Sequence, residues 1–296
     1  MSTSSLSRKK LWFAALKPPM YSVAVIPIWV GSAMAWSETK ALDWPIFLTF
    51  LGSAILIIAW LNLSNDVFDS DTGIDINKHH SLVNLTQNRR LILGLANGLL
   101  GMGCLGILAI ALRQQDATVL GLVGLSCCLG YTYQGPPFRL GYQGLGEIIC
   151  FVTFGPLAIC AAYYSQAQSW SVAALAASVI VGITTSIILF CSHFHQVADD
   201  LAAGKRSPIV RLGTARGAQL LPWLCGSVYG FVILGIATQL FSPWTGLVFV
   251  SLPFALQLNW QVITYHAQPK QVSNCKFIAV SWHFWSGVLL GLGLIL

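Results

Sequence analysis

Hydrophobic residues occur along the chain in long continuous runs. Within a run they neither alternate with polar residues nor recur only at the spacing of one helix face. Each run has roughly the 20 residues that an α-helix needs to cross the hydrocarbon core of a bilayer. Strands of a membrane β-barrel would alternate apolar and polar residues instead. We therefore predict an all-α membrane protein with about nine transmembrane helices, near residues 20–37, 46–64, 91–112, 117–134, 147–164, 170–194, 218–240, 244–264 and 276–295.

Lysine and arginine residues are distributed unequally over the segments between these runs. With a cytoplasmic N-terminus, fourteen of them fall on the cytoplasmic side and only Lys40 and Arg113 on the other. Cytoplasmic loops of membrane proteins carry such an excess. The pattern predicts a cytoplasmic N-terminus and supports nine spans. It also puts the three long polar loops, 65–90, 134–146 and 195–217, on the cytoplasmic side.

The composition agrees with a single membrane domain over residues 1–296. Of the 296 residues, 55% are hydrophobic and 9% are charged, whereas soluble domains have about 25% charged residues. The net charge of +6 belongs to loops, and no basic run exceeds three residues. We therefore expect the lipid bilayer, and not nucleic acid, as a partner.

Four of the ten acidic residues stand in the segment 65–75, directly after the apolar run 46–64. Carboxylates at the end of a membrane span are costly to place there and usually mark a functional site. We call the segment 65–75 the first acidic cluster.

A second cluster, residues 196–206, follows the predicted sixth span, four helices after the first. Asp200 precedes Gly204 by four positions, just as Asp69 precedes Gly73. Basic residues come next in both cases. An even separation predicts a repeat that runs in the same direction, so both clusters emerge on the same side of the membrane.

Helical spacing would place the polar residues of each cluster on one face. Asn62 and Asp66 are four positions apart, as are Gln196 and Asp200, and Asp69 follows Asp66 by three. Two such faces across a cavity would offer oxygen atoms from both sides. Mg²⁺ takes a few carboxylates, keeps waters and completes its shell with substrate phosphate oxygens. We therefore predict Mg²⁺ with a phosphate-bearing substrate.

Basic and aromatic residues near the clusters are candidates for further contacts. Arg139, Lys205 and Arg206 would contact the remaining phosphate charge, arginine through its planar guanidinium. Tyr131 and Tyr133 either anchor the chain at the membrane interface or form an aromatic wall that faces a cation.

Simpler explanations remain open for several polar residues. Asp71, Asp75 and Asp199 are equally well explained as caps of helix ends and turns. The first acidic cluster lacks the spacing of a calcium-binding EF-hand loop. His193 and His195 lack the sequence context of zinc ligands, which leaves hydrogen-bonding or structural roles for both.

Together these motifs resemble the UbiA superfamily of intramembrane aromatic prenyltransferases. The segment 65–75 reads Asn-Asp-x-x-Asp-x-x-x-Gly-x-Asp, which resembles the branch acting on 1,4-dihydroxy-2-naphthoate. The second motif of the family often begins with Asp, and here Gln196 stands in that place. Segments similar to those of cyanobacterial and plastid members are 81–86, 131–147, 192–196 and 204–213.

The resemblance implies a UbiA-type helical bundle and a Mg²⁺-dependent reaction. A phytyl or other polyprenyl group would pass from its diphosphate to 1,4-dihydroxy-2-naphthoate with loss of CO₂, in phylloquinone or menaquinone biosynthesis. The implied membrane is a bacterial plasma membrane or a thylakoid, with the active site on the cytoplasmic side.

The resemblance also implies roles for individual residues. Catalytic roles fall to Asp66, Asp69, Asp200, Tyr131 and Tyr133. The implied contacts of the diphosphate are Asn62, Asn65, Lys78, Arg139, Lys205 and Arg206. The implied metal ligands are Asp66, Asp69, Asp75, Gln196, Asp199 and Asp200.

Two other functions remain open. The acceptor could be another aromatic compound, such as 4-hydroxybenzoate or homogentisate, because its choice depends on the shape of the cavity. A cation-coupled transporter would share the intramembrane acids and the tandem repeat. Against a transporter, both clusters lie at the inner ends of spans, and the outer half has no matching polar path.

Overall fold

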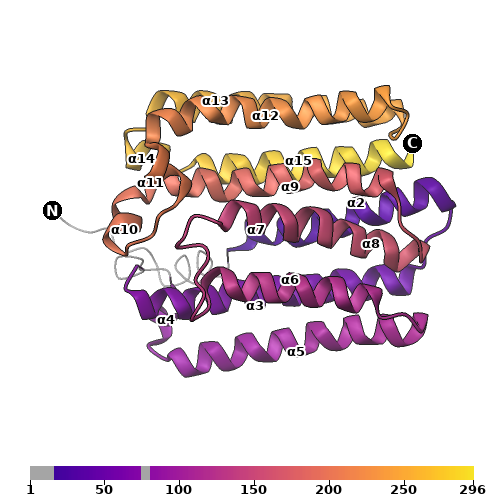
Figure 1. Cartoon of the computed structure of the whole chain (residues 1–296), viewed down its shortest axis with the longest axis horizontal. Coiled ribbons are helices and arrows are strands. Elements are labelled where there is room, and N and C mark those ends of the chain that lie inside the picture. Colours follow the sequence, from indigo (N-terminus) through magenta and orange to yellow (C-terminus); the bar gives the residue numbers. More distant parts are fainter. Residues whose placement is uncertain (1–16, 75–80) are drawn as a thin grey trace.

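The computed structural model describes residues 17–74 and 81–296, and all regular structure in these ranges is helical. The long helical segments lie side by side (Figure 1). They are α2 (Ser22–Thr39), α3 (Trp44–Thr72), α5 (Arg89–Gln114), α6 (Thr118–Gln134), α7 (Gly146–Val152) continued by η2 (Thr153–Leu157) and α8 (Ala158–Ala167), α9 (Val172–Ser192), α12 (Thr214–Ala237), η4 (Pro243–Ser251) continued by α13 (Leu252–Tyr265), and α15 (Cys275–Ile295).

Short helices connect the long ones. They are η1 (Pro18–Tyr21), α4 (Leu82–Thr86), η3 (His193–His195), α10 (Val197–Ala202), α11 (Pro208–Leu212) and α14 (Pro269–Val272). Figure 1 shows α4, α10, α11 and α14 at one end of the bundle, on the left, and the C-terminus at the other end. The clusters predicted to be functional belong to the end with the short helices.

Within the described ranges, eight helical segments are long and apolar enough to cross a membrane. They match eight of the nine predicted spans. The remaining predicted span, 117–134, forms α6, a helix of 17 residues. The all-α fold and the integral membrane character are thus confirmed, whereas the number of nine spans and the cytoplasmic N-terminus stay predictions.

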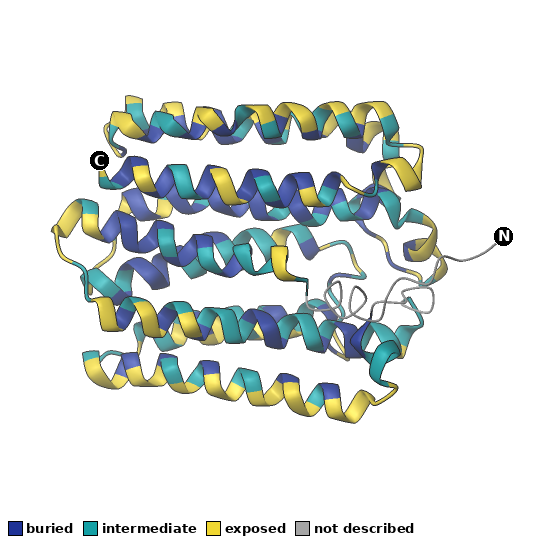
Figure 2. Cartoon of the chain, turned by 180° about the vertical axis from the view of Figure 1, so that it is seen from behind, coloured by how far each residue is buried: buried dark blue, intermediate teal, exposed yellow. Residues whose placement is uncertain are grey.

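The outer helices expose apolar side chains along their length. Leu105 of α5 is 64% exposed and Trp223 of α12 is 79% exposed. Figure 2 shows exposed residues along the outward faces of α5, α12 and α13, while buried residues fill the helices between them. A surface of this kind is stable against lipid, where all backbone polar groups are satisfied within the helices.

Small residues let the central helices approach closely. A Cβ atom on Gly31 of α2 would lie 2.6 Å from the backbone oxygen of Ile159 in α8, and one on Gly291 of α15 would lie 2.0 Å from Nε1 of Trp29. Membrane helices associate through such contacts because lipid provides no hydrophobic driving force between them. The core is therefore built around α2, α8, α9 and α15.

The first acidic cluster is more regular than the predicted loop 65–90. Helix α3 continues through the cluster to Thr72 and ends at Gly73, whose φ of 75° is the left-handed conformation common after a helix. Helix α3 therefore ends later than the predicted span 46–64, and the helical spacing predicted for Asp66 and Asp69 is present. The polar turn stays helical because its acidic side chains find partners on neighbouring segments.

Candidate active site

A cavity of about 690 Å³ lies at the end of the bundle that carries the short helices. Residues from the C-terminal halves of α3, α6 and α9 line it, together with residues near the beginning of α2, α7 and α15. Polar residues on its wall include the predicted Asn62, Asn65, Tyr133 and Gln196, while much of the remaining wall is apolar. The volume lies within the range of about 300–1,000 Å³ that is usual for small-molecule sites.

A smaller apolar pocket of about 80 Å³ extends the cavity into the bundle. The two share wall residues from α2, α3, α6 and η2, including Val23, Ile58 and Phe154. The shared residue Thr153 begins η2, where the helix widens into a π-helical turn that contains Pro156. Such turns are frequent at functional sites. The site thus combines a polar mouth with an apolar interior.

The carboxylate of Asp66 is almost completely buried and has two identified partners. The ammonium of Lys17, just before η1, lies 2.9 Å from Oδ1, and the backbone N–H of Leu82 donates to Oδ2 at 3.1 Å. Asp66 is 1% exposed, so its charge needs these partners. They tie α3 to the beginning of the described chain and to α4.

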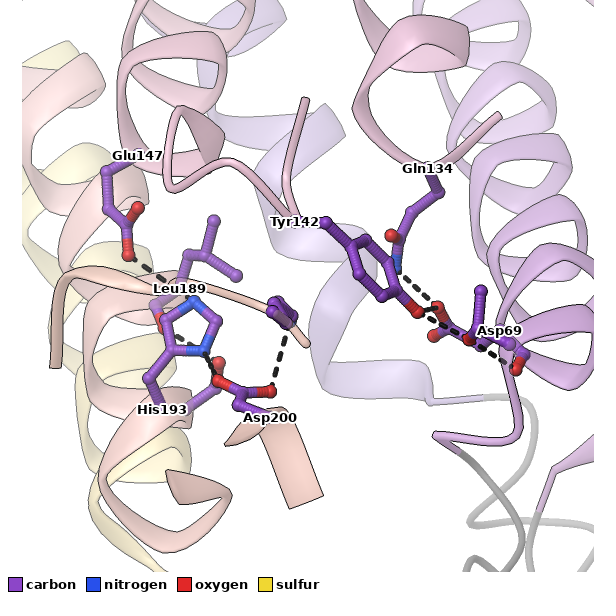
Figure 3. Close-up of polar contacts among 10 residues, drawn as sticks. Asp69, Gln134, Tyr142, Glu147, Leu189, His193 and Asp200 are labelled. Atoms are coloured by element: carbon purple, nitrogen blue, oxygen red, sulfur yellow. Dashed lines mark hydrogen bonds and ion pairs between the residues drawn. The ribbon is translucent and has the colours of Figure 1, made fainter. Parts of the chain in front are cut away.

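Asp69 points toward the loop after α6. Its Oδ1 accepts a hydrogen bond from Nε2 of Gln134 at 2.8 Å and one from the hydroxyl of Tyr142 at 3.4 Å (Figure 3). The Tyr142 hydroxyl also lies 2.6 Å from Oγ1 of Thr72. Burial and the nearby charge of Asp69 raise the pKa of Tyr142, so its hydroxyl keeps its proton.

Asp200, at the start of α10, is completely buried between a histidine and a lysine. His193 Nδ1 lies 3.0 Å from Oδ2 and Lys205 Nζ lies 3.4 Å from Oδ1. On its other side, His193 Nε2 lies 3.4 Å from Oε1 of Glu147 (Figure 3). Burial acts to raise the pKa of Asp200, but the hydrogen bond with His193 and the charge of Lys205 outweigh it and hold that pKa below its usual value.

Tyr142 joins the two clusters. Its hydroxyl reaches Asp69, while Lys205 Nζ lies 5.9 Å from the centroid of its ring. Its backbone oxygen accepts a hydrogen bond from the N–H of Arg206 at 2.8 Å. The loop after α6 therefore packs between the acidic end of α3 and the segment after α10. The predicted proximity of the two clusters is realised through this loop.

The other predicted residues occupy several environments. Asp199 and Arg206 are exposed, whereas Lys205 is buried beside Asp200. Arg139 is half-buried, and its Nε has no hydrogen-bond partner among the described residues. Asp75 and Lys78 lie outside the described residues.

The two predicted tyrosines differ in position. Tyr133 lines the cavity, and its ring packs against two glycines, where Cβ atoms on Gly141 and Gly146 would lie 2.5 and 2.8 Å from Cε2. Tyr131 is 39% exposed, and its hydroxyl donates to the backbone oxygen of Pro136. Of the two predicted tyrosines, Tyr133 therefore stays a candidate for the aromatic wall of the cavity, and we assign no catalytic role to Tyr131.

The sequence patterns did not single out four polar residues that hold the site together. These residues are Lys17, Gln134, Tyr142 and Glu147. Three of them, Gln134, Tyr142 and Glu147, belong to the turn-rich segment 131–147, whose resemblance to the family was the available signal. Lys17 pairs with Asp66, 49 positions away, so no local pattern predicts its role. His193, for which a hydrogen-bonding or structural role was left open, bonds to Asp200.

The donor set of the clusters fits Mg²⁺ in chemistry. Among the described residues no three His, Cys, Asp or Glu side chains converge as a metal centre. Carboxylate oxygens of Asp66, Asp69 and Asp200 are hard donors, and Asp200 Oδ1 accepts no hydrogen bond within the described ranges, its contact there being the ion pair with Lys205. Mg²⁺ commonly uses one or two carboxylates and completes its shell with substrate phosphates. The clusters therefore fit a Mg²⁺ site that is shared with substrate phosphates, rather than one whose ligands all come from the protein.

Comparison with known proteins agrees with this arrangement. The chain is 60% identical over 293 residues to the 2-carboxy-1,4-naphthoquinone phytyltransferase of Synechocystis, covering 99% of this chain and 95% of the relative. It is 43% identical to the chloroplastic enzyme of the same name from Arabidopsis thaliana, covering 98% of this chain and 78% of that one.

Solved structures share the fold. A UbiA homologue from Archaeoglobus fulgidus superposes with a TM-score of 0.65 at 15% identity, covering 96% of this chain and 99% of the other. The same homologue bound to GPP and Mg²⁺ gives a TM-score of 0.57 at 14% identity, covering 95% and 99%. The model of the UbiA prenyltransferase family matches residues 24–288. The chain therefore belongs to the UbiA prenyltransferase family.

Proposed function

We propose that the protein transfers a phytyl group from phytyl diphosphate to 1,4-dihydroxy-2-naphthoate, with release of diphosphate and CO₂. The observation that carries this proposal is the near-complete match, at 60% identity, to a relative named for phytyl transfer to a carboxylated naphthoquinone. The cavity supports it, because polar residues of both clusters meet an apolar interior that suits a long prenyl chain.

The diphosphate of the donor binds at the mouth of the cavity, between the two clusters. Asp66, Asp69 and Asp200 would hold Mg²⁺, which supplies positive charge to the departing diphosphate when it is bound. The side-chain amides of Asn62 and Asn65 line the same wall and would contact the phosphate oxygens. Gln196 offers a neutral oxygen from the second cluster. Lys205, buried beside Asp200, adds positive charge.

We assign no contact with the diphosphate or Mg²⁺ to five of the predicted residues. They are Asp75, Lys78, Arg139, Asp199 and Arg206. Two of them lie outside the described residues, and Asp199 and Arg206 face solvent. The prenyl tail extends past Val23 and Phe154 into the smaller apolar pocket. That orientation places the reactive end of the donor beside Tyr133.

The reaction breaks the allylic C–O bond of the donor and forms a C–C bond to the ring of the acceptor. Positive charge develops on the allylic carbon, and the ring of Tyr133 lies where it can stabilise that charge. The acceptor loses its carboxylate as CO₂, whose bonding electrons stay with the ring. The ring therefore neither gains nor loses a proton in the substitution. Apolar walls keep water from the cation.

The oxidation state of the acceptor follows from this chemistry. An electron-rich ring attacks a carbocation, which favours the quinol 1,4-dihydroxy-2-naphthoate over its oxidised form. The names of the relatives from Synechocystis and Arabidopsis thaliana refer to the oxidised form, 2-carboxy-1,4-naphthoquinone. We therefore assign the quinol as the reacting form, and the membrane as a bacterial plasma membrane or a thylakoid with the cavity on the cytoplasmic side.

The experiment that tests the function crosses donors with acceptors in purified protein reconstituted in lipid. Phytyl, geranylgeranyl and longer diphosphates are combined with dihydroxynaphthoate, its quinone, 4-hydroxybenzoate and homogentisate, and prenylated product is measured. We expect product from dihydroxynaphthoate, with preference for a twenty-carbon donor. Equal or better use of 4-hydroxybenzoate would overturn the acceptor, and product from the quinone without a reductant would overturn the assigned oxidation state.

A further inference from the structure

The cavity has a second polar wall that the diphosphate site does not use. Its residues come from the end of α9 with η3, and from the beginning of α15. They are Ser192, His195, Ser273, Asn274 and Lys276. Helix α15 lies on a different side of α7 and α8 from α3 (Figure 1), so this wall is separate from the first acidic cluster.

The charge of the cavity wall favours an anion at this place. Among the described residues that line the cavity, none is Asp or Glu, and two are cationic, Lys17 and Lys276. Lys17 is 2.9 Å from the carboxylate of Asp66. Lys276, the second residue of α15, is the cation that the wall formed by η3 and α15 contributes to the cavity.

Neighbouring groups add hydrogen-bond donors. The Nδ1 atom of His195 is buried and has no hydrogen-bond partner among the described residues. Asn274 is the residue before α15, whose 21 residues begin at Cys275. The first N–H groups of a helix this long favour a negative charge nearby. Phe277 follows on the same wall and offers an apolar face.

We propose that this wall, with Lys276 as its charged residue, binds the carboxylate of the naphthoate acceptor. The inference rests on the proposed function, since it assigns the acceptor's place in the same cavity. A flat apolar ring with one carboxylate needs one cation, a few neutral donors and apolar contact, and the wall supplies each of these. The diphosphate carries more charge and is assigned to the two clusters with Mg²⁺.

Binding of unreactive analogues tests the subsite without turnover. The full chain in detergent or lipid is titrated with 1-hydroxy-2-naphthoate and with 1-naphthol, which lacks the carboxylate. We expect Lys276→Gln to weaken binding of the naphthoate about tenfold, as for loss of a charge-assisted hydrogen bond, and to leave binding of 1-naphthol unchanged. Lys270→Gln removes the same charge from an exposed residue of nearby α14 and should change neither.

Two results of this titration would overturn the proposal. One is equal affinity of the wild type and Lys276→Gln for the naphthoate. The other is an equal loss for both analogues, which would show that Lys276 only maintains the shape of the cavity. Lys276→Arg, which keeps the charge, should restore most of the affinity for the naphthoate.

Steady-state kinetics separate the acceptor from the donor. In Lys276→Gln we expect a raised KM for dihydroxynaphthoate and an unchanged KM for phytyl diphosphate. A raised KM for the donor alone would place Lys276 in the diphosphate site and contradict the proposal. If the wild type transfers no prenyl group to any acceptor, the proposed function fails, and the analogue titration still decides whether a carboxylate subsite exists.

Discussion

Lys205 Nζ lies 5.9 Å from the centroid of the Tyr142 ring, and this contact brings the two acidic clusters together. The same lysine is 3.4 Å from Asp200, while the Tyr142 hydroxyl bonds to Asp69 and lies beside Thr72. One side chain thus contacts both halves of the proposed diphosphate site, so their separation depends on its size and its hydroxyl.

Substitution of Tyr142 should separate these two contributions. Tyr142→Phe keeps the ring under Lys205 and loses the hydroxyl, so we expect KM for phytyl diphosphate to rise by about two- to tenfold, as for one neutral hydrogen bond. Tyr142→Ala removes both contacts and should have a larger effect. Equal KM values in the wild type and both variants would contradict a positioning role, and thermal unfolding checks that the variants remain folded.

The acids of the first cluster should be essential for turnover. Asp66→Asn and Asp69→Asn are each expected to lower kcat by about 100-fold or more, the loss seen when charge stabilisation of a transition state is removed. The control is Asp71→Asn on the same helix. Asp71 forms an exposed pair with Arg89 at 2.7 Å, and such pairs contribute at most about 1 kcal/mol to stability. Activity in Asp66→Asn close to that of Asp71→Asn would argue that Asp66 only stabilises the fold.

The second cluster contains a matched pair of neighbours. Asp200 is buried beside Lys205, whereas Asp199 is exposed. We expect Asp200→Asn to lose about 100-fold or more in kcat, and Asp199→Asn to keep activity within about twofold, because surface substitutions rarely disturb a site. Prenyl transfer assays of both variants at saturating Mg²⁺ decide this point. A larger loss in Asp199→Asn would restore the sequence-based prediction that Asp199 is a metal ligand.

His193 should position Asp200 for the metal. It connects Asp200 to Glu147 through its two ring nitrogens, at 3.0 and 3.4 Å. Loss of a residue that orients a metal-binding carboxylate commonly weakens metal affinity about 10–100-fold. We therefore expect His193→Gln to raise the Mg²⁺ concentration needed for half-maximal activity about tenfold, with a smaller rise in Glu147→Gln.

The metal titration distinguishes positioning from simple stabilisation of the fold. Excess Mg²⁺ should recover most of the activity of His193→Gln, and binding of Mn²⁺ measured by electron paramagnetic resonance should weaken in parallel. A lowered Tm with an unchanged Mg²⁺ requirement would show that His193 acts only through stability. Removal of divalent ions with a chelator should abolish turnover of the wild type, and readdition should restore it.

Close packing of α2 against α8 should be sensitive to one added methyl group. In Gly31→Ala the new Cβ would lie 2.6 Å from the backbone oxygen of Ile159, so the helices must separate. Overpacking of this kind costs about 1–3 kcal/mol and should lower Tm in detergent. Gly52→Ala on α3 is the control, because nothing lies within 4 Å of its added Cβ; equal Tm values for the two variants would contradict the packing argument.

The sequence by itself determined the class of the fold and the candidate residues of the site. Apolar runs of roughly 20 residues can satisfy their backbone in lipid only as helices, so the spans followed directly from hydropathy. Asp66, Asp69 and Asp200 stood out because carboxylates beside apolar spans are rare. The family motifs then narrowed the reaction to prenyl transfer, which the relatives' names support.

Only the tertiary structure decided how these residues meet. Lys17 and Asp66 are 49 positions apart and Gln134 and Asp69 are 65 apart, so no local pattern predicts either pair. Hydropathy also could not tell Asp199 from Asp200, since burial depends on how α10 packs beside Lys205. Helical periodicity is local, whereas hydrogen bonds between distant segments form only after the bundle assembles. The positions of Tyr133 and Lys276 on one cavity follow from that assembly alone.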